Sequence, residues 1–221
     1  VNKNFSDWSV NVNLGVSLTD SRYESIGYEG GLKIYNFFAV HNLDFDKAWK
    51  PKQEGWHDQT RAIFANAELG WKSMLYLTVT GRNDWDSKLA FSKQKSFFYP
   101  SVGLSALLSE MVKLPEVISY AKIRGSYTVV ASSFDRFLTN PGYEYNSQTH
   151  NWANPTVYPM DNMKPEKTKS WEIGLNLKFW GNRFNLDATY YRSNTLNQTF
   201  KVDIPSSSGY KQAIVQAGNV Q

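Results

Sequence analysis

The sequence predicts an all-β protein in which an antiparallel up-and-down sheet forms part of a transmembrane β-barrel. Apolar and polar residues alternate along several segments of about 9 to 13 residues, the length that tilted membrane strands need. Shorter and longer connections follow one another in turn from residue 42 onward, as in an up-and-down meander. No segment of convincing length has the helical period, and no apolar run approaches the roughly 18 to 20 residues of a membrane-spanning helix.

The first expected strand covers residues 8–19, where apolar and polar side chains alternate without error. The same period of two recurs in residues 63–71, 75–82, 98–108, 121–129, 171–179 and 184–190. Residues 32–41 and 212–221 are two further candidates. About eight or nine strands are therefore expected, with no helical crossover between them.

The connections fall into two classes. Short periplasmic turns are expected near 72–73, 109–119 and 180–183, and long extracellular loops near 42–59, 83–96, 131–165 and 202–211. In a membrane barrel the turns at one end are short and the loops at the other end are long. The whole chain, residues 1–221, is accordingly expected to be part of one barrel domain.

The apolar faces could contact lipid or a second sheet, since alternation alone allows both. Strands of soluble sheets most often have about five or six residues, whereas these are longer. Aromatic residues also gather at strand ends, as in the girdles of membrane barrels. The pattern favours lipid over a soluble β-sandwich core. The side chains expected to face lipid or form the girdle are Trp71, Trp171, Phe179, Trp180, Phe184 and Leu186.

Composition narrows the function classes. The chain has 221 residues, 15% of them aromatic, a mean hydropathy of −0.50 and no cysteine. There is therefore no disulfide framework, thiolate nucleophile or cysteine-based zinc site. The net charge of +4 is spread along the chain without a Lys/Arg run, so nucleic acid is not an expected partner. The first residue is Val1 and no signal pattern follows it, so we expect a trimmed chain or a piece of a longer one.

Residues 164–200, KPEKTKSWEIGLNLKFWGNRFNLDATYYRSNTLNQTF, resemble the SusC/RagA family of TonB-linked outer-membrane proteins. The shared features are K-P-E, E-x-G-L, an N-R-hydrophobic hairpin and a Tyr-Tyr strand. Four other landmarks agree in order: YLTVTGRNDWDSKLA, FFYPSVGLSALLSE, SYAKIRGSYTVVASS and IPSSSGYKQAIVQAGNVQ. The chain departs from the family pattern in the stretch after the first of these, at Ala106, and after the Ser-Tyr strand. These departures affect loops rather than strands.

The resemblance implies a function as well as a fold. Members of the family are importers in the bacterial outer membrane, with a 22-stranded barrel, a plug, energy supplied by the TonB complex and a SusD-like surface lipoprotein as lid. This chain would then be an internal or C-terminal part of the barrel, without the plug. The expected cargo is a nutrient such as an oligosaccharide or an oligopeptide, and no enzymatic activity is expected. The alternative from another class is a secreted β-rich carbohydrate-binding protein or glycoside hydrolase.

Candidate binding residues come from the long loops and the polar strand faces. Aromatic rings stack on sugars and amides read hydroxyl groups, which suits the loop 131–165. Four charged residues within strands would face the lumen of a barrel: Arg82, Lys122, Arg124 and Glu172. The expected cargo-contacting residues are Arg82, Asp84, Trp85, Asp86, Arg124, Tyr143, Tyr145, Asn151, Trp152 and Glu172.

The same residues also allow other chemistry. Asp84 and Asp86 are the pair that a glycoside hydrolase would require, although neighbouring loop aspartates more often form turns or bind an incidental Ca²⁺. His41, His57 and His150 are far apart in the sequence, so we expect no metal site or catalytic triad. No cofactor is expected.

Overall fold

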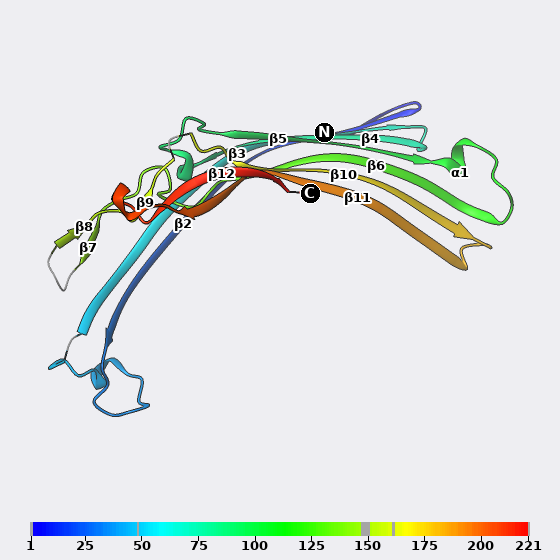
Figure 1. The fold of residues 1–221 in the computed structure, drawn as a ribbon. Coiled ribbons are helices and arrows are strands. Elements are labelled where there is room, and N and C mark those ends of the chain that lie inside the picture. The colour runs from blue at the N-terminus through cyan, green and yellow to red at the C-terminus, as the bar shows by residue number, and fades with distance from the viewer. Residues whose placement is uncertain (1, 48, 147–150, 161, 221) are drawn as a thin grey trace.

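The chain forms one curved, mostly antiparallel sheet with a small separate hairpin beside it (Figure 1). The computed structural model describes residues 2–47, 49–146, 151–160 and 162–220. Ten strands lie in the order β1-β2-β3-β4-β5-β6-β10-β11-β12-β9, and β7 pairs with β8. Among the strands that the structure describes, β12 and β9 are the one parallel pair. Within the described residues the sheet does not close on itself, as expected for part of a barrel.

The strands are β1 (Asn2–Phe5), β2 (Trp8–Gly30), β3 (Trp49–Trp71), β4 (Leu75–Asp86), β5 (Phe97–Leu107), β6 (Ile118–Ser132), β7 (Glu144–Asn146), β8 (Asn151–Ala153), β9 (Val157–Tyr158), β10 (Glu166–Phe179), β11 (Phe184–Asp203) and β12 (Gln212–Val220). The helical turns are η1 (Val40–Asn42), η2 (Ser87–Leu89), α1 (Leu108–Met111) and η3 (Ser206–Ser208). No helix in the described part of the chain is long and apolar enough to cross a membrane.

Each strand predicted from the alternation is present, and residues 212–220 form β12. Residues 32–41 do not form a strand. The buried side chain of Asn42 accepts a hydrogen bond from the Ile34 amide at 3.0 Å and donates to the carbonyls of Ile34 and Phe37 at 2.8 and 2.7 Å. These bonds fold the segment into a loop, because they use backbone groups that a strand would need for pairing.

The cross-strand register sorts side chains onto two faces. The apolar face carries Leu14, Ile63, Val79, Leu104, Ile123, Ile173 and Leu186, which lie on one side because directly paired residues share a face. The polar face carries Glu68, Arg82, Lys122, Arg124, Glu172, Asn176 and Asp187. The apolar face has no second layer over it: Ile63 is 56% exposed and Ile173 is 53% exposed.

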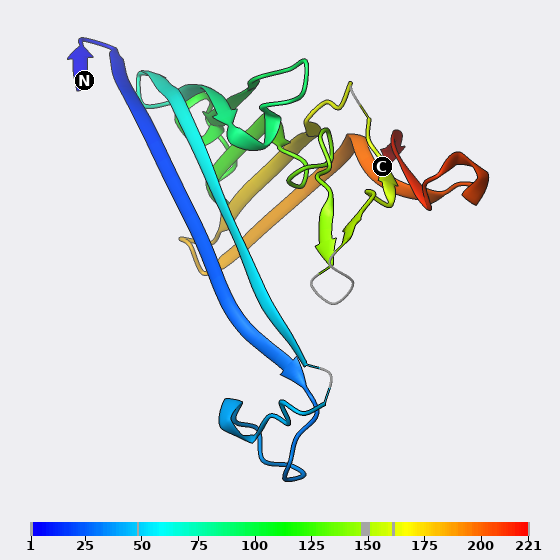
Figure 2. The same ribbon diagram turned by 90° about the vertical axis from the view of Figure 1, so that its left-hand side faces the viewer.

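Strands β2 and β3 extend well beyond the rest of the sheet. They pair along their whole length, from Trp8 with Trp71 to Gly30 with Trp49, whereas β4 reaches only to Thr60 of β3. Beyond that point they form a two-stranded arm, made of residues 20–30 and 49–59, which ends in a loop that includes residues 31–47 (Figure 2). The expected loop 42–59 was therefore wrong for residues 49–59, whose pattern is irregular. Residues 49–55 are all exposed, so no buried face requires alternation there.

The other connections lie close to their predicted places. Residues 83–86 belong to β4, which leaves 87–96 as the loop, and the remaining long loops are 133–165 and 204–211. In an antiparallel meander these loops share one end of the sheet, here called the long-loop end, with the arm. The short turns occupy the other end. The turn between β3 and β4 has positive φ at Lys72 and Ser73, and the turn between β10 and β11 has positive φ at Trp180, Gly181 and Asn182, as tight hairpins require.

A small core lies at the long-loop end. Its buried members are Leu89, Phe97, Phe134, Met163 and Ile214. They come from η2, β5, the loop 133–165 and β12, so this core joins segments that are distant in the sequence. It holds the long loop against the end of the sheet, whereas the remaining strands are held together by backbone pairing and by cross-strand side-chain contacts.

Candidate functional site on the polar face and the long-loop end

One cluster on the polar face is built around Asp84, which is only 7% exposed. Arg82 Nε donates to Asp84 Oδ1 at 2.7 Å, and the Tyr99 hydroxyl donates to Asp84 Oδ2 at 3.0 Å. The guanidinium of Arg82 also lies 5.9 Å from the ring centre of Phe64. Both carboxylate oxygens of Asp84 already accept hydrogen bonds, so this carboxylate holds Arg82 and Tyr99 in place and is not available as a catalytic group for hydrolysis.

A second polar cluster lies nearer the short-turn end. Arg124 Nη2 donates to Thr189 at 2.8 Å, and Arg124 forms ion pairs with Glu172 and Asp187, each at 3.4 Å. The arginine comes from β6 and its partners from β10 and β11, so its side chain crosses β10. It crosses at Gly174, where a Cβ atom would lie 2.5 Å from Arg124 Nε. The absence of a side chain at this position is what allows the bridge.

Ionic and aromatic contacts tie the loop 133–165 to β3. Arg136 Nε donates to Asp58 Oδ2 at 2.6 Å, and its guanidinium lies 3.8 Å from the ring centre of Trp56. Ser133 Oγ donates to Asp86 Oδ2, also at 2.6 Å. These partners lie at the base of the arm and the end of β4, so the base of the loop is fixed in place.

That loop carries the hairpin β7–β8, which brings two of the predicted binding residues together. The rings of Tyr145 and Trp152 pair across the hairpin with centroids 5.1 Å apart. Tyr143 precedes the hairpin, and Asn151 begins its second strand. All three aromatic side chains are more than half exposed. The hairpin therefore presents an accessible aromatic surface with an amide beside it at the long-loop end.

Trp85 does not join the other predicted site residues. It lies on the apolar face opposite Arg61, whereas its neighbours Asp84 and Asp86 lie on the polar face. Its ring lines an apolar hollow with Ile63, Gly81 and others. The assignment of Trp85 to cargo binding assumed that residues 83–96 form a loop. Since residues 83–86 belong to β4, alternation places Trp85 on the other side of the sheet.

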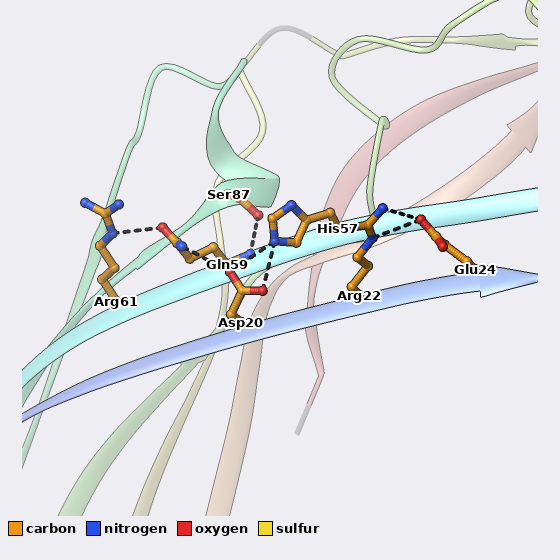
Figure 3. Close-up of polar contacts among 7 residues, drawn as sticks. All are labelled: Asp20, Arg22, Glu24, His57, Gln59, Arg61 and Ser87. Atoms are coloured by element: carbon orange, nitrogen blue, oxygen red, sulfur yellow. Dashed lines mark hydrogen bonds and ion pairs between the residues drawn. The ribbon is translucent and has the colours of Figure 1, made fainter.

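A polar network covers one side of the arm (Figure 3). His57 Nε2 lies 2.9 Å from Asp20 Oδ1, and Gln59 Nε2 donates to Asp20 Oδ2 at 3.2 Å. These hydrogen bonds lower the pKa of the Asp20 carboxyl below its usual 3.8. Arg22 pairs with Glu24 in the same network. The network lies on the continuation of the apolar face, so it does not belong to the polar-face clusters.

The two described histidines, His41 and His57, do not come together. His57 pairs with Asp20, the ring centre of His41 lies 5.4 Å from that of Phe37, and His150 lies outside the described residues. Among the described residues there is no group of three or more His, Asp or Glu side chains placed to hold a metal ion. Sequence reasoning missed Arg136, Tyr99 and Gly174, since nothing in their local sequence marks which distant strand each one meets.

A profile of the family described as "TonB dependent receptor-like, beta-barrel" matches residues 2–221. This chain belongs to that family. Two curated relatives are the TonB-dependent receptors P39 and P3 of Formosa agariphila, each 25% identical over 72% of this chain. The chain spans 16% and 17% of the length of these two relatives.

Solved structures agree on the fold. The RagAB peptide transporter matches 97% of this chain with a TM-score of 0.80 and 15% identity, over 24% of its own chain. The RagAB peptide importer in its open-open state matches 98% with a TM-score of 0.78 and 17% identity, also over 24% of its chain. The ferripyoverdine receptor of the Pseudomonas aeruginosa outer membrane matches 97% with a TM-score of 0.53 and 18% identity, over 27% of its chain.

TonB-dependent receptor barrels reside in the bacterial outer membrane, and the family consists of transporters rather than enzymes. The predicted localisation and the predicted resemblance are thus confirmed. The apolar face of this TonB-dependent receptor barrel segment is the lipid side, and the polar face is the lumen side. The alternative of a soluble β-sandwich is wrong for this chain. In a sandwich a second sheet would cover the apolar face, whereas here Ile63 and Ile173 on that face are more than half exposed.

The lipid-facing band has aromatic residues at both margins. At the short-turn end, Phe179, Trp180 and Phe184 pack together with ring centroids 5.8 to 6.4 Å apart, and Trp71 packs on Trp8 at 6.4 Å. Towards the long-loop end, Trp171 packs on Tyr190 at 5.3 Å. Such rows mark the two membrane–water interfaces of a barrel.

The band runs obliquely across the strands. The first charged residue on the apolar face towards the long-loop end is Arg61 on β3 and Arg192 on β11. The row of paired residues that starts at Arg192 on β11 crosses five strand spacings and reaches Ala67 on β3. Ala67 is six residues from Arg61, so the margin shifts by six residues over five strand spacings. Six residues span about 20 Å and five spacings about 24 Å, which corresponds to strands tilted by about 40°. This tilt is typical of membrane barrels.

Proposed function

We propose that this chain forms part of the barrel wall of a TonB-dependent outer-membrane importer. The observation that carries this proposal is the pairing of a lipid-facing band with a lumen face rich in fixed charges, in a chain that belongs to the TonB-dependent receptor family. Import through such a barrel draws its energy from the TonB complex, which acts on parts of the protein outside this segment. The charged residues on the lumen face keep the inner surface of the barrel hydrated, and the proposed role of this segment involves no covalent chemistry.

We further propose that the aromatic hairpin contacts the cargo before it enters the barrel. Tyr145 and Trp152 are paired, exposed and carried by a loop whose base is fixed through Arg136. An aromatic surface held on a fixed base loses little conformational freedom on binding. Aromatic rings with adjacent amides suit an oligosaccharide or an oligopeptide. The solved RagAB relatives are a peptide transporter and importer by description, which makes a peptide the first cargo to test.

A SusD-like surface lipoprotein is the proposed lid of the complete importer. It would cover the long-loop end, where the arm and the loop 133–165 project (Figure 1). Such a lid would enclose cargo between itself and the aromatic hairpin. This partner is supported by the resemblance to SusC/RagA proteins and by the structural similarity to the RagAB peptide transporter.

The test uses the full-length protein in cells that depend on it for growth on a peptide mixture or on a defined glycan. Trp152→Ala should lower cargo affinity about five- to thirtyfold, since a well-placed aromatic contact is worth about 1–2 kcal/mol. Trp85→Ala is the matched control because Trp85 faces lipid. Equal uptake by wild type and Trp152→Ala, or an equal loss in both variants, would refute the role of the hairpin in cargo binding.

A further inference from the structure

An apolar hollow lies on the lipid side of the sheet, over strands β2 to β5. It has a volume of about 670 Å³, within the range of small-molecule sites in proteins. Two small residues that line it, Ala65 and Gly81, pair across β3 and β4. The ring of Phe98 lies against Gly81, where a Cβ atom would be 3.1 Å from it. The larger side chains around these small residues are Leu14, Val16, Ile63, Trp85 and Phe98.

Asn83 places an amide group in this apolar hollow. It lies on the lipid face, since it pairs with Ile63 of β3 and Phe98 of β5. The residues two positions away on β4, Gly81 and Trp85, share its face. All four neighbours are apolar. Among the described apolar-face positions within residues 8–18, 63–71, 75–85 and 98–106, Asn83 has the one amide side chain.

The side-chain amide of Asn83 has no hydrogen-bond partner among the residues that the structure describes. Its apolar neighbours leave it half-buried. An amide without a hydrogen-bond partner is strongly disfavoured in hydrocarbon, because the bilayer core offers no water in its place. A ligand that brings a carbonyl oxygen to this depth would satisfy the Asn83 amide.

A cation lies one row nearer the long-loop end. Arg61 of β3 pairs with Trp85 of β4, so Asn83 is the diagonal neighbour of Arg61, about 7 Å away. Arg61 is exposed, its Nε donates to Gln59 Oε1 at 2.9 Å, and its terminal nitrogens point away from the other side chains drawn (Figure 3). Within the described part of the chain no carboxylate forms an ion pair with Arg61. Its guanidinium is therefore accessible to an anion at the margin of the band.

These three features follow one another in depth as the parts of a membrane lipid do. Arg61 lies at the margin of the lipid-facing band, Asn83 one row inside it, and the pair Ala65 and Gly81 one row further in. Each row is two residues deeper, about 7 Å along the strand, or about 5 Å of depth at a tilt of about 40°. Phosphate, acyl carbonyls and acyl chains succeed one another in the same order from the head-group region to the hydrocarbon core.

We propose that the hollow holds an acyl chain of a phosphate-bearing lipid from the membrane leaflet at the long-loop end. Arg61 binds the phosphate through charge-assisted hydrogen bonds, and Asn83 Nδ2 donates to the carbonyl oxygen of the ester bond. The chain lies over Ala65 and Gly81, beside the ring of Phe98. Such binding fixes the depth of the barrel in the membrane. The inference goes beyond nutrient import and does not depend on which cargo is carried.

The test measures lipid binding to the full-length protein, purified in a mild detergent, by native mass spectrometry. The probe is phosphatidylglycerol with ester-linked chains, compared with its ether-linked analogue, which keeps the phosphate and the chains but lacks the carbonyl oxygens. Wild type should bind the ester lipid about fivefold more tightly, as expected for one hydrogen bond. Asn83→Leu should remove this preference. Asn66→Leu is the matched control and should keep it, because Asn66 pairs with Thr80 on the lumen face.

Two further substitutions test the other contacts. Arg61→Gln should weaken phosphatidylglycerol binding about fivefold, whereas Arg22→Gln should change it little, because Arg22 is already paired with Glu24. Ala65→Leu should fill the hollow and weaken binding of both lipids about tenfold. Ala67→Leu is its control, since Ala67 lies one row deeper and does not line the hollow.

Heat-modifiable migration reports whether each variant has assembled. The comparison of ester and ether lipids needs only the wild-type protein, so it decides the question even where a variant fails to assemble. Equal binding of the two lipids by wild type, a preference that survives in Asn83→Leu, or an equal loss in a variant and its control would overturn the proposal.

Discussion

A charge placed at the centre of the lipid-facing band gives the sharpest test of the membrane assignment. Leu175 lies four residues from Trp171 and four from Phe179, the two aromatic margins on β10. Four residues span about 13 Å along a strand, or about 10 Å of depth at a tilt of about 40°. Leu175 therefore lies close to the middle of an apolar layer about 20 Å thick on this strand.

Leu175→Arg should destabilise the folded barrel by about 2–4 kcal/mol, the cost of an arginine on the lipid face at the bilayer midplane. This corresponds to a loss of about 30- to 900-fold in the folding equilibrium constant. The natural Arg192 is tolerated on the same face because it lies at the margin, where the cost falls to about 0–1 kcal/mol. The assay is denaturant-induced unfolding of the full-length protein in lipid vesicles, read by heat-modifiable migration.

The matched control is Asn176→Arg, which adds the same charge one residue further along β10 but on the lumen face. It removes the hydrogen bond from Asn176 to Asp187, 2.9 Å long, at a cost of about 1 kcal/mol. Leu175→Arg should therefore be the more destabilised of the two variants. If both unfold at the same denaturant concentration, the assignment of the apolar face to lipid is refuted.

Three further predictions concern the lumen and the arm. Gly174→Val should displace Arg124, which crosses β10, and lower the free energy of unfolding in denaturant by about 1–3 kcal/mol. Gly103→Val should lower it less, because a Cβ atom at Gly103 would have only ordinary contacts at 3.9 Å. Equal effects of the two substitutions would contradict the bridge from Arg124 to its partners. Arg136→Ala should free the loop 133–165 and speed amide hydrogen exchange of β7–β8 without changing exchange in β3; unchanged exchange in the hairpin would count against the tie. His57→Ala should raise the pKa of Asp20 towards 3.8, because the hydrogen bond that lowers it is lost. Since the folded-state pKa of Asp20 is lowered, its contribution to arm stability is present above pH 3.8 and is lost as the pH falls through that lowered value. Carboxyl chemical shifts of Asp20 measured against pH, in wild type and in His57→Ala, would report the lowered pKa and its rise in the variant.

Strand pairing follows from the sequence wherever one face of a strand is strictly apolar. The segment 171–179 and its partner 184–190 have such a face, and a slip of one residue would expose it to the wrong side. The arm is the opposite case. Residues 49–55 continue a strand although their pattern is irregular, because they are exposed and their pairing with β2 holds them in place. Local pattern carries no signal for a strand of that kind.

The candidate site residues also divide into those whose face follows from local alternation and those whose contacts depend on the path of the chain. Arg82, Arg124 and Glu172 were placed on the lumen side by alternation, and the register agrees. Trp85 was misplaced because its strand was ended too early. That Tyr145 meets Trp152 depends on a hairpin inside a long loop, and such a contact follows from the path of the loop rather than from its composition.

Local alternation is enough to show that this is an all-β chain, that its strands follow one another as a meander, and which side chains of a strand share a face, because a period of two is a local property. How the rows of different strands align is visible only in the folded sheet. That alignment sets the oblique band, places Asn83 beside Arg61 at its margin, and brings Arg124 across Gly174 to its partners. Register between strands is a long-range property, fixed by the backbone hydrogen bonds and side-chain contacts of several strands together.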